Sequence, residues 1–222
     1  MTDEEAISWL QQQLHVSRET LGELERFVTF LKREAQSQNL ISASTLDHIW
    51  SRHIVDSAQL LTLLGDVHPN MRWLDLGAGA GFPGLIIAML TEFHVTLVES
   101  RARRIEYLER AVEMLDLSKR VRVAGIALER LETAPFSVIS ARAFAPLPKL
   151  FALASRFSTN NTLWLLPKGR NASHEWSAAQ KDWQGEFRVA TSVTDQDAGI
   201  LVGTLSESRH TSATSATQGQ MA

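Results

Sequence analysis

The sequence predicts an α/β fold in which a mostly parallel sheet of seven strands is covered by helices on both faces. Two observations support this fold class. From residue 71 onward, short apolar segments alternate with stretches of helical periodicity, which is the pattern of repeated β–α–β units. A glycine-rich turn directly follows the first of these apolar segments, as expected where a buried strand leads into a helix.

Residues 1–70 are expected to form a helical extension of this domain. Thr2 with Glu5, and Ser44 with Asp47, have the spacing of capping boxes at helix N-termini. Apolar side chains recur at helical spacing over two stretches of this region. These stretches cover residues 21–31 and 46–61, and residues 36–42 are expected to form the loop between them.

Seven segments further along the chain have the composition of strands. They are residues 72–76, 94–98, 121–124, 136–140, 163–166, 187–193 and 200–205, with helices between most of them, notably at 102–115 and 147–157. A short polar turn separates the last two segments, so we expect an antiparallel hairpin at the edge of the sheet. The tail at 206–222 is rich in Ser, Thr, Ala and Gln and is expected to be disordered, which leaves 71–205 as the globular domain.

The composition excludes several classes of protein. A chain of 222 residues with 44% hydrophobic content is long enough for one α/β domain with an extension. It contains no cysteine, so disulfide frameworks and thiolate metal sites are excluded. No apolar run approaches the ~20 residues of a membrane span, and the polar N-terminus does not resemble a signal peptide. We therefore expect a soluble, cytoplasmic protein without membrane contact.

The turn at residues 73–84 (WLDLGAGAGFPG) indicates a site for a ligand that contains a nucleoside. Its glycines permit positive φ angles and let a ligand approach where a Cβ atom would clash. Pro83 stands at the first turn of the following helix, where its missing N–H would have no partner anyway. Glu99 ends the next apolar run, about 20 residues further on, where an acid can accept hydrogen bonds from ribose hydroxyls.

Two kinds of nucleoside cofactor are compatible with this turn. Gly79, Gly81 and Gly84 fit the G-x-G-x-x-G pattern of dinucleotide-binding proteins. The overlapping pattern, with Asp75 at the end of the strand and Gly77 after it, favours S-adenosylmethionine. The reason is that a carboxylate attracts the cationic methionine moiety and repels a pyrophosphate. A tight turn that binds no ligand is the third interpretation.

Basic residues gather in one part of a chain whose net charge is only −3. Residues 133–174 contain no acidic residue, and a basic face of this kind suits a polyanionic partner. A second basic group lies within residues 101–122, but glutamates on the same helix can pair with its arginines, so a solvated outer face is an equally good interpretation there. The cations of the acid-free segment are Arg142, Lys149, Arg156, Lys168 and Arg170.

Five blocks of the chain occur in the order found in a known enzyme family. They are residues 39–41 (NLI), 52–57 (RHIVDS), 75–84 (DLGAGAGFPG), 140–144 (SARAF) and 167–169 (PKG). Together they closely resemble the bacterial 16S rRNA (guanine-N7)-methyltransferase G family, formerly called glucose-inhibited division protein B, from about residue 20 to 205. The resemblance implies a Rossmann-like class I methyltransferase fold. It also implies an S-adenosylmethionine-dependent enzyme that methylates N7 of one guanine in small-subunit rRNA.

The resemblance also implies where the cofactor binds. Arg142, which follows the fourth strand, would lie beside both the cofactor and the target base. Family members often carry an Arg-x-Glu element after the third strand, whereas this chain reads GIALERLE at residues 125–132. Contacts there would use the backbone, or Glu129 or the shifted Arg130-Leu131-Glu132 would supply the side chain. The expected cofactor-binding residues are Asp75, Gly77, Gly79, Phe82, Glu99, Ala127, Leu128 and Arg142.

Methylation of guanine N7 requires positioning rather than proton transfer. The N7 atom offers a lone pair and has no proton to remove, so the enzyme mainly holds N7 and the methyl carbon in near-attack geometry. Arg142 is the first expected catalytic residue, because its planar fork can contact guanine O6 or a nearby phosphate. The alternative is a structural ion pair between Arg142 and Asp75 or Glu99.

His53, Asp56 and Lys168 complete the expected catalytic set. His53 and Asp56 are three residues apart on an expected helix, so they share one face. That face either packs over the mouth of the cofactor site or locks the N-terminal helices onto the domain. Lys168 ends the fifth strand, on the side where open α/β sheets bind ligands, which suggests a contact with RNA. No metal is expected, because the seven histidines are scattered and His48 does not share a helical face with His53.

Two functions of other classes stay open beside the methyltransferase. They are an NAD-dependent oxidoreductase and a catalytically silent rRNA-binding assembly factor. The intact glycines, Asp75 and Arg142 argue against the silent protein, since a silent site is free to lose them. The expected partner is 16S rRNA within the small ribosomal subunit or its precursor, and the protein is expected to act as a monomer.

Overall fold

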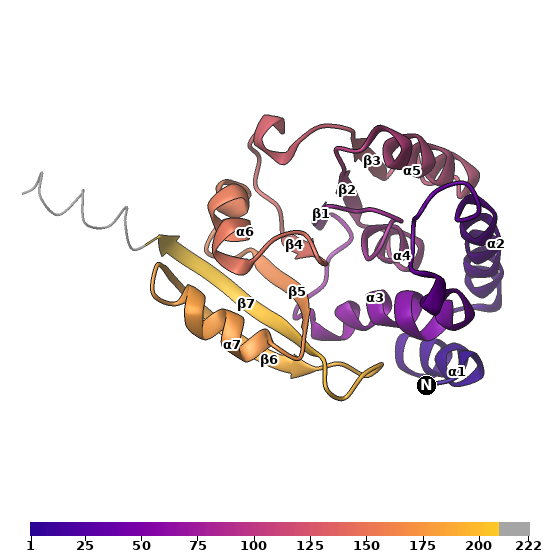
Figure 1. Cartoon of the computed structure of the whole chain (residues 1–222), viewed down its shortest axis with the longest axis horizontal. Helices are drawn as coiled ribbons and strands as arrows, with labels where there is room; N and C mark the ends of the chain where they lie inside the picture. Colours follow the sequence, from indigo (N-terminus) through magenta and orange to yellow (C-terminus); the bar gives the residue numbers. More distant parts are fainter. Residues whose placement is uncertain (209–222) are drawn as a thin grey trace, which may run out of the picture.

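A seven-stranded sheet forms the centre of the computed structural model, which describes residues 1–208 (Figure 1). The strand order is β3-β2-β1-β4-β5-β7-β6. The first five strands pair in parallel, whereas β7 is antiparallel to both β5 and β6, which confirms the predicted mixed sheet with a C-terminal hairpin. The strands are β1 (Arg72–Leu76), β2 (His94–Val98), β3 (Val121–Ala124), β4 (Val138–Ala141), β5 (Leu163–Gly169), β6 (Trp183–Thr191) and β7 (Gly199–Ser208).

Several predicted strand ends are wrong in the second half of the sheet. β4 begins at Val138 rather than at Phe136, because the N–H of Phe136 donates instead to the carbonyl of Phe157, at 3.0 Å. The pairing of β6 and β7 continues past a bulge between Gln184 and Gly185, so β6 begins earlier than expected and β7 ends later, whereas β6 already ends at Thr191 and not at residue 193. Residues 206–208 therefore belong to β7 and not to the expected tail. The rest of that tail, 209–222, lies outside the described residues.

The N-terminal region is helical, as predicted, although much of it is not regular α-helix. The capping box of Thr2 and Glu5 is confirmed, with hydrogen bonds of 2.7 and 3.2 Å. The second predicted box is wrong, because Ser44 lies inside a 3₁₀ helix and its hydroxyl bonds to that of Ser42. The elements are α1 (Asp3–Leu14), α2 (Arg18–Glu34), the 3₁₀ helix η1 (Ala43–His48), the π-helix η2 (Trp50–Val55), α3 (Asp56–Ala58) and the 3₁₀ helix η3 (Gln59–Leu63).

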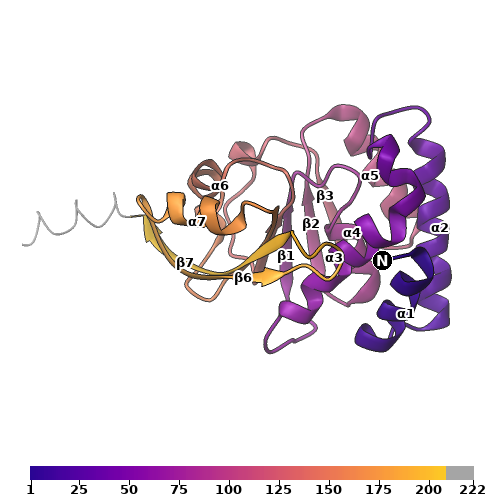
Figure 2. The same ribbon diagram turned by 60° about the horizontal axis from the view of Figure 1, so that its bottom comes forward.

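Helices cover both faces of the sheet, and Figures 1 and 2 show α2, α4 and α5 on one side and α6 and α7 on the other. Successive side chains of β1 alternate between two cores, as the period of a strand requires. Trp73 packs with α1, α2, α4 and α5, whereas Leu74 packs with α6 and α7. The remaining helices are α4 (Gly84–Leu90), α5 (Ala102–Met114), η4 (Leu128–Arg130), α6 (Leu147–Ala154), η5 (Ser155–Phe157) and α7 (Ala172–Ala179).

The N-terminal helices share one continuous core with the sheet. Phe27 of α2 and Ile54 of η2 are fully buried in the same cluster as Leu85 of α4. The boundary expected at residue 70 falls in the connection between η3 and β1. Within residues 1–208, no helix combines the length and the apolarity needed to cross a membrane.

The topology also determines where a ligand can bind. The chain order reverses at β1, which lies between β2 on one side and β4 on the other. In open α/β sheets, the connections that leave the carboxyl ends of two such strands run to opposite faces and leave a crevice between them. The glycine-rich turn after β1 and the Arg142 segment after β4 both lie at this edge.

Candidate functional site

Two neighbouring cavities open at the carboxyl edge of the sheet. The smaller cavity, of about 400 Å³, follows β1, β2 and β3, and the larger cavity, of about 960 Å³, lies between β4, β5, η2 and the turn that joins β6 to β7. Residues 143–145 line both of them. The predicted Gly77, Glu99, Ala127 and Leu128 line the smaller cavity, and His53, Asp56, Arg142 and Lys168 line the larger one.

The turn after β1 needs glycine for two different reasons. Gly77, Gly79 and Gly81 all have positive φ, at 69°, 56° and 92°, where a side chain is strained. A Cβ atom on Gly77 would in addition lie 2.7 Å from the ring of Phe144. At Gly79, by contrast, a Cβ atom would be in ordinary van der Waals contact with Nη1 of Arg104 and the carbonyl oxygen of Gly77, both at 3.7 Å, so only the backbone conformation requires glycine there.

Glu99 holds the turn against the end of β2. Its carboxylate is almost fully buried and accepts hydrogen bonds from the backbone N–H groups of Gly79 (3.2 Å), Ser100 (2.8 Å) and Arg101 (3.0 Å). The guanidinium of Arg104 lies 3.8 Å from the oxygen that Gly79 contacts. That oxygen retains one acceptor position, because a carboxylate can accept about four hydrogen bonds. The predicted contact between Glu99 and a ribose stays a prediction.

Asp75 lies behind the glycine turn and lines neither cavity, although the sequence suggested that it points into the ligand crevice. Its carboxylate is fully buried and accepts hydrogen bonds from the Ser140 hydroxyl (2.8 Å) and from the N–H of Gly84 (3.0 Å). Burial raises the pKa of Asp75 to about 6, against the lowering effect of these two hydrogen bonds. The geometry therefore indicates that Asp75 fixes the start of α4 relative to β1 and β4.

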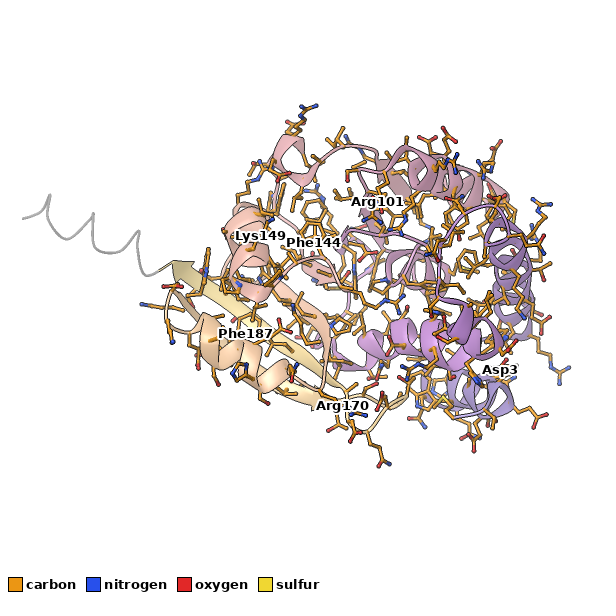
Figure 3. The ribbon with its side chains drawn as sticks, in the orientation of Figure 1. Asp3, Arg101, Phe144, Lys149, Arg170 and Phe187 are labelled. Atoms are coloured by element: carbon orange, nitrogen blue, oxygen red, sulfur yellow. The ribbon has the colours of Figure 1, made fainter. Side chains whose placement is uncertain are left out.

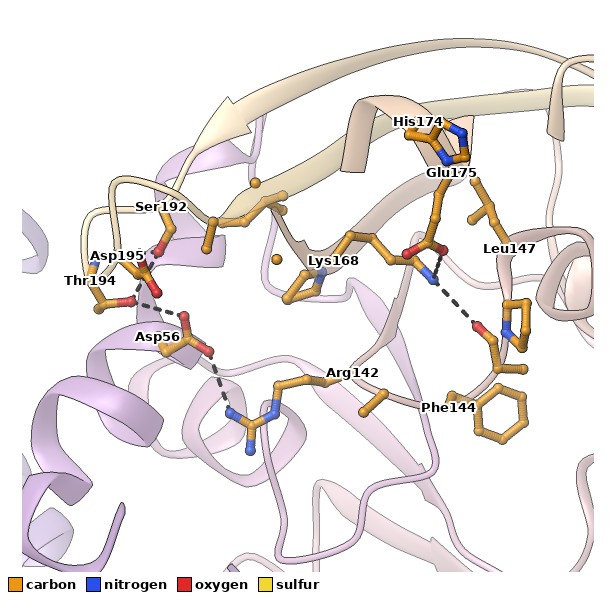
Figure 4. Close-up of a pocket in the computed structure, with 18 of the residues that line it drawn as sticks. Asp56, Arg142, Phe144, Leu147, Lys168, His174, Glu175, Ser192, Thr194 and Asp195 are labelled. Atoms are coloured by element: carbon orange, nitrogen blue, oxygen red, sulfur yellow. Dashed lines mark hydrogen bonds and ion pairs between the residues drawn. The ribbon is translucent and has the colours of Figure 1, made fainter. Parts of the chain in front are cut away.

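Arg142 is held between two side chains of the N-terminal helices, and Figure 4 shows its contact with one of them, Asp56. Its Nη1 lies 3.4 Å from Oδ2 of Asp56, and its Nη2 lies 3.2 Å from Nδ1 of His53. The guanidinium carbon lies 5.3 Å from the centre of the Phe82 ring, within cation–π distance. The side chain keeps 26% of its surface exposed. Arg142 thus pairs with Asp56. The alternative interpretation from the sequence, a structural ion pair of Arg142 with Asp75 or Glu99, is wrong.

His53 is neutral in this arrangement. Burial and, next, the positive charges of Arg142 and Arg52 lower the pKa of His53 to about 3. Since Arg142 can only donate, Nδ1 of His53 is the acceptor and the proton resides on Nε2, which lies 2.9 Å from the hydroxyl of Thr45. The ring also stacks on Phe82 with a centroid distance of 4.9 Å. His53 and Asp56 therefore both bind Arg142 from one helical segment.

Asp56 is the first residue of α3, and His53 lies in the preceding η2, a π-helix of a kind that is rare and frequent at functional sites. Lys168 lies across the larger cavity from it and is nearly buried. Its ammonium group pairs with Glu175 at 3.0 Å and donates to the carbonyl of Ala145 at 3.4 Å, as Figure 4 shows. The lysine therefore anchors the segment that lines both cavities, and its predicted RNA contact stays a prediction.

Most cations of the acid-free segment have partners elsewhere in the fold. Arg156 donates to Thr133 and to the carbonyl of Leu128, and Arg170 pairs with Asp197 at 3.0 Å. Lys149, on α6 at the edge of the smaller cavity, has no ion pair or hydrogen bond to any other described residue (Figure 3). The basic face is therefore smaller than the charge pattern suggested.

Four residues of the site were not predicted from the sequence. They are Thr45, Gln59, Phe144 and Thr194, which carry no charge and belong to no catalytic pattern. One signal was available for Gln59, since it follows Asp56 by three residues, the spacing of a helical side-chain pair. Thr194 is 138 residues from its partner Asp56, so no local pattern links the two.

Solved structures share this fold at low sequence identity. A putative O-methyltransferase from Klebsiella pneumoniae matches with a TM-score of 0.58 and 14% identity, covering 90% of this chain and 96% of that chain. A SAM-dependent methyltransferase from Aquifex aeolicus matches with a TM-score of 0.57 and 15% identity, covering 78% and 97%. These likenesses confirm the predicted class I methyltransferase fold.

Sequence relatives are much closer. The Ribosomal RNA small subunit methyltransferase G of Rhizorhabdus wittichii is 53% identical over 203 residues, covering 91% of this chain and 92% of the relative. The protein of the same name from Zymomonas mobilis is 51% identical over 210 residues, covering 92% and 94%. The family model described as rRNA small subunit methyltransferase G matches residues 20–200. The chain therefore belongs to the rRNA small subunit methyltransferase G family.

Proposed function

We propose that this protein uses S-adenosylmethionine to methylate N7 of one guanine in the 16S rRNA of the small ribosomal subunit. It acts as a monomer and without a metal ion. The observation that carries the proposal is the position of Arg142. Its guanidinium is directed into the larger cavity, and the three residues that follow it line both cavities. A cofactor in the smaller cavity and a base in the larger one would meet beside this side chain.

The smaller cavity suits the nucleoside part of the cofactor. Its volume of about 400 Å³ lies within the range of small-molecule sites, about 300–1,000 Å³. Glu99 offers the acceptor position that a ribose hydroxyl needs, and Ala127 and Leu128 offer an apolar wall for a flat base. Gly77, from the glycine turn, lines the same cavity. When bound, S-adenosylmethionine supplies a methyl group on a positively charged sulfur.

Arg142 has the donor geometry to orient a guanine. Of its five N–H groups, those facing Asp56, His53 and the carbonyl of Arg52 are engaged at 3.2–3.4 Å. The Nε–H and one N–H of Nη2 remain for the guanine O6 or a phosphate oxygen. Because N7 carries no proton, the site needs no general base, and the neutral His53 serves as a hydrogen-bond acceptor for Arg142. Catalysis then rests on orientation.

The proposal is tested by mapping methylated nucleotides in 16S rRNA from cells with and without the protein. We expect one N7-methylguanosine to disappear in its absence and to return when the purified protein is supplied with S-adenosylmethionine. Intact small subunits and naked 16S rRNA, tested in parallel, identify the form of the substrate. An rRNA that keeps the same methylation pattern in both strains would overturn the proposal. Rescue of subunit assembly without methyl transfer would identify the silent assembly factor instead.

Calorimetry of cofactor binding distinguishes the methyltransferase from the alternative function, an NAD-dependent oxidoreductase. We expect S-adenosylmethionine and its demethylated product to bind and NAD not to bind. The fully buried carboxylate of Asp75 behind the turn disfavours a pyrophosphate at this position. NAD binding at micromolar strength, with no response to S-adenosylmethionine, would contradict the proposed cofactor.

A further inference from the structure

We propose that Gln59 is a positioning residue for the methyl transfer, because it fixes the carboxylate of Asp56 against Arg142. This inference rests on the proposed function and goes beyond it. Gln59 begins η3, is 2% exposed and does not line either cavity. It therefore acts only through its neighbours and does not touch a substrate.

The orientation of the Gln59 amide follows from its partners. Its Oε1 faces the backbone N–H of Val193 at 2.9 Å, and an N–H group can only donate. The amide nitrogen must then point the other way. There it lies 2.9 Å from Oδ1 of Asp56 and 3.1 Å from the hydroxyl of Ser192. The amide cannot flip without placing two donors face to face, so the donor to Asp56 is fixed.

Asp56 uses its two carboxylate oxygens for different purposes. Oδ1 accepts from Gln59 and from the hydroxyl of Thr194, at 2.9 and 3.1 Å. Oδ2 remains for Arg142, at 3.4 Å. An unrestrained carboxylate would rotate to form a bidentate pair with the guanidinium, which is shorter and stronger. The two donors on Oδ1 prevent this rotation and leave the guanidinium extended toward the larger cavity.

Gln59 also connects two walls of the larger cavity. Asp56 belongs to the helical wall, whereas Ser192 and Thr194 belong to the turn between β6 and β7, and all three line the cavity. Arg52 makes a second contact between these walls, to Asp195 at 3.4 Å. A displacement of Arg142 of ~1 Å would reduce the rate on the order of a hundredfold. The amide of Gln59 is thus placed to control the rate without contacting RNA or cofactor.

The test is a double-mutant cycle between Gln59 and Asp56 in the full-length protein. Gln59→Met keeps the approximate shape of the side chain and removes both its amide donors and the oxygen that accepts from Val193. We expect it to lower the single-turnover rate of methylation by about 10- to 100-fold at saturating RNA and cofactor, with the affinity for S-adenosylmethionine unchanged. In the Asp56→Ala background, Gln59→Met should change the rate by less than about twofold, because the carboxylate that Gln59 positions is already absent. Equal losses in both backgrounds would overturn the inference.

Thr194→Val provides a second variant that does not depend on the buried amide. It removes the other donor to Oδ1 of Asp56 from a half-buried position. We expect a smaller loss of rate that likewise vanishes in the Asp56→Ala background. Thermal melting of each variant separates loss of folding from loss of positioning. A wild-type protein that is inactive on every rRNA substrate would contradict the proposed function, whereas an active wild type with additive mutants would contradict only the role of Gln59.

Discussion

The two cavities at the edge of the sheet are built in different ways. The smaller cavity is formed by segments that follow β1, β2, β3 and β4 and by one side of α6. The larger cavity depends on side chains from four separate parts of the chain, around residues 45–56, 142–148, 167–175 and 192–200. Several of its polar side chains are paired across these parts, as Arg142 is with Asp56 and Arg52 with Asp195. The second cavity therefore depends on pairs that are distant in sequence, whereas the first follows the ends of successive strands.

In the proposed function, the two cavities have different tasks: the smaller one binds the cofactor and the larger one binds the RNA base. A cofactor that is the same in many enzymes can be held by a turn whose glycines and backbone N–H groups set its shape. A single nucleotide of a large RNA requires side chains in a defined position, because the base must meet the methyl group in line. We therefore expect changes in the larger cavity to affect the rate, and changes in the smaller cavity to affect cofactor affinity.

The largest expected effect comes from Arg142→Ala. We expect methyl transfer to fall by at least about 100-fold, while the affinity for S-adenosylmethionine and the melting temperature stay close to those of the wild type. Arg142→Lys should restore little activity, because a point charge cannot replace the planar fork. Single-turnover methylation of the small subunit, calorimetry of the cofactor and thermal melting measure the three quantities.

Arg170→Ala is the matched control for this variant. Arg170 comes from the same acid-free segment, but it is exposed and paired with Asp197. It lines neither cavity. Activity of Arg142→Ala close to that of Arg170→Ala would remove Arg142 from the mechanism. A strongly lowered melting temperature in Arg142→Ala alone would show that the guanidinium has a structural role between Asp56 and His53.

At the turn that contacts Glu99 of the smaller cavity, Gly79→Val should weaken cofactor binding by more than tenfold, which corresponds to about 1.4 kcal/mol. A β-branched side chain disfavours the φ of 56°, and a change there would release the hydrogen bond from Gly79 to Glu99. The side chain would also press on the guanidinium of Arg104, which a Cβ atom at this position already contacts. Gly169→Val is the control, because Gly169 has a similar φ of 65° and lies outside the smaller cavity. Equal cofactor affinity in the two variants would contradict this role of the turn.

The same difference explains how much of the site was predictable. The turn from Asp75 to Gly84 is one local pattern, and the strand that precedes it is apolar, so both the fold and the position of the smaller cavity follow from the sequence. Arg142 and His53 were found through the family resemblance. Their joint contact depends on how the N-terminal helices pack on the sheet, which no local pattern contains.

The orientation of Asp75 and the pairing of two cations, Lys168 and Arg156, could not be predicted from residue type. The sequence placed Asp75 in an open crevice, because an acid at the end of a strand usually points there. The Ser140 hydroxyl and the N–H of Gly84 bind both of its oxygens instead. In the same way, Lys168 pairs with Glu175, just outside the acid-free segment, and Arg156 donates to the carbonyl of Leu128, which is 28 residues away. Long-range pairing of this kind cannot be inferred from charge counts.

Two buried groups close to the site, His53 and Asp75, have shifted pKa values, and the two shifts have opposite effects on stability. The pKa of His53 falls from 6.5 to about 3, so between pH 4 and 6 the unfolded chain binds a proton that the folded chain does not. Stability then rises with pH. The pKa of Asp75 rises from 3.8 to about 6, so in the same range the folded chain binds the extra proton and stability falls as pH rises.

His53→Gln should expose the contribution of Asp75. As the pH is raised from 4 to 6, the free energy of unfolding of the variant should fall relative to that of the wild type, by up to about 1.4 kcal/mol per pH unit. Urea denaturation at intervals of half a pH unit measures this difference. A constant difference between the two proteins over this range would mean that His53 is charged in the folded state, and the hydrogen bond from Arg142 to its Nδ1 could not then form.

The smallest expected effect concerns Lys149, at the edge of the smaller cavity. Its ammonium group is exposed and is not engaged by any other residue within 1–208, so it is free to contact an RNA phosphate. Lys149→Ala should reduce the slope of log affinity against log salt by ~0.7, the value for one phosphate contact to a single strand. Lys181→Ala, an exposed lysine after α7 that lines neither cavity, should leave the slope unchanged. Filter binding of 16S rRNA over a range of salt concentrations measures both slopes. A wild-type affinity that does not change with salt would rule out phosphate contacts at this edge, and RNA recognition would then depend on the side chains around Arg142 in the larger cavity.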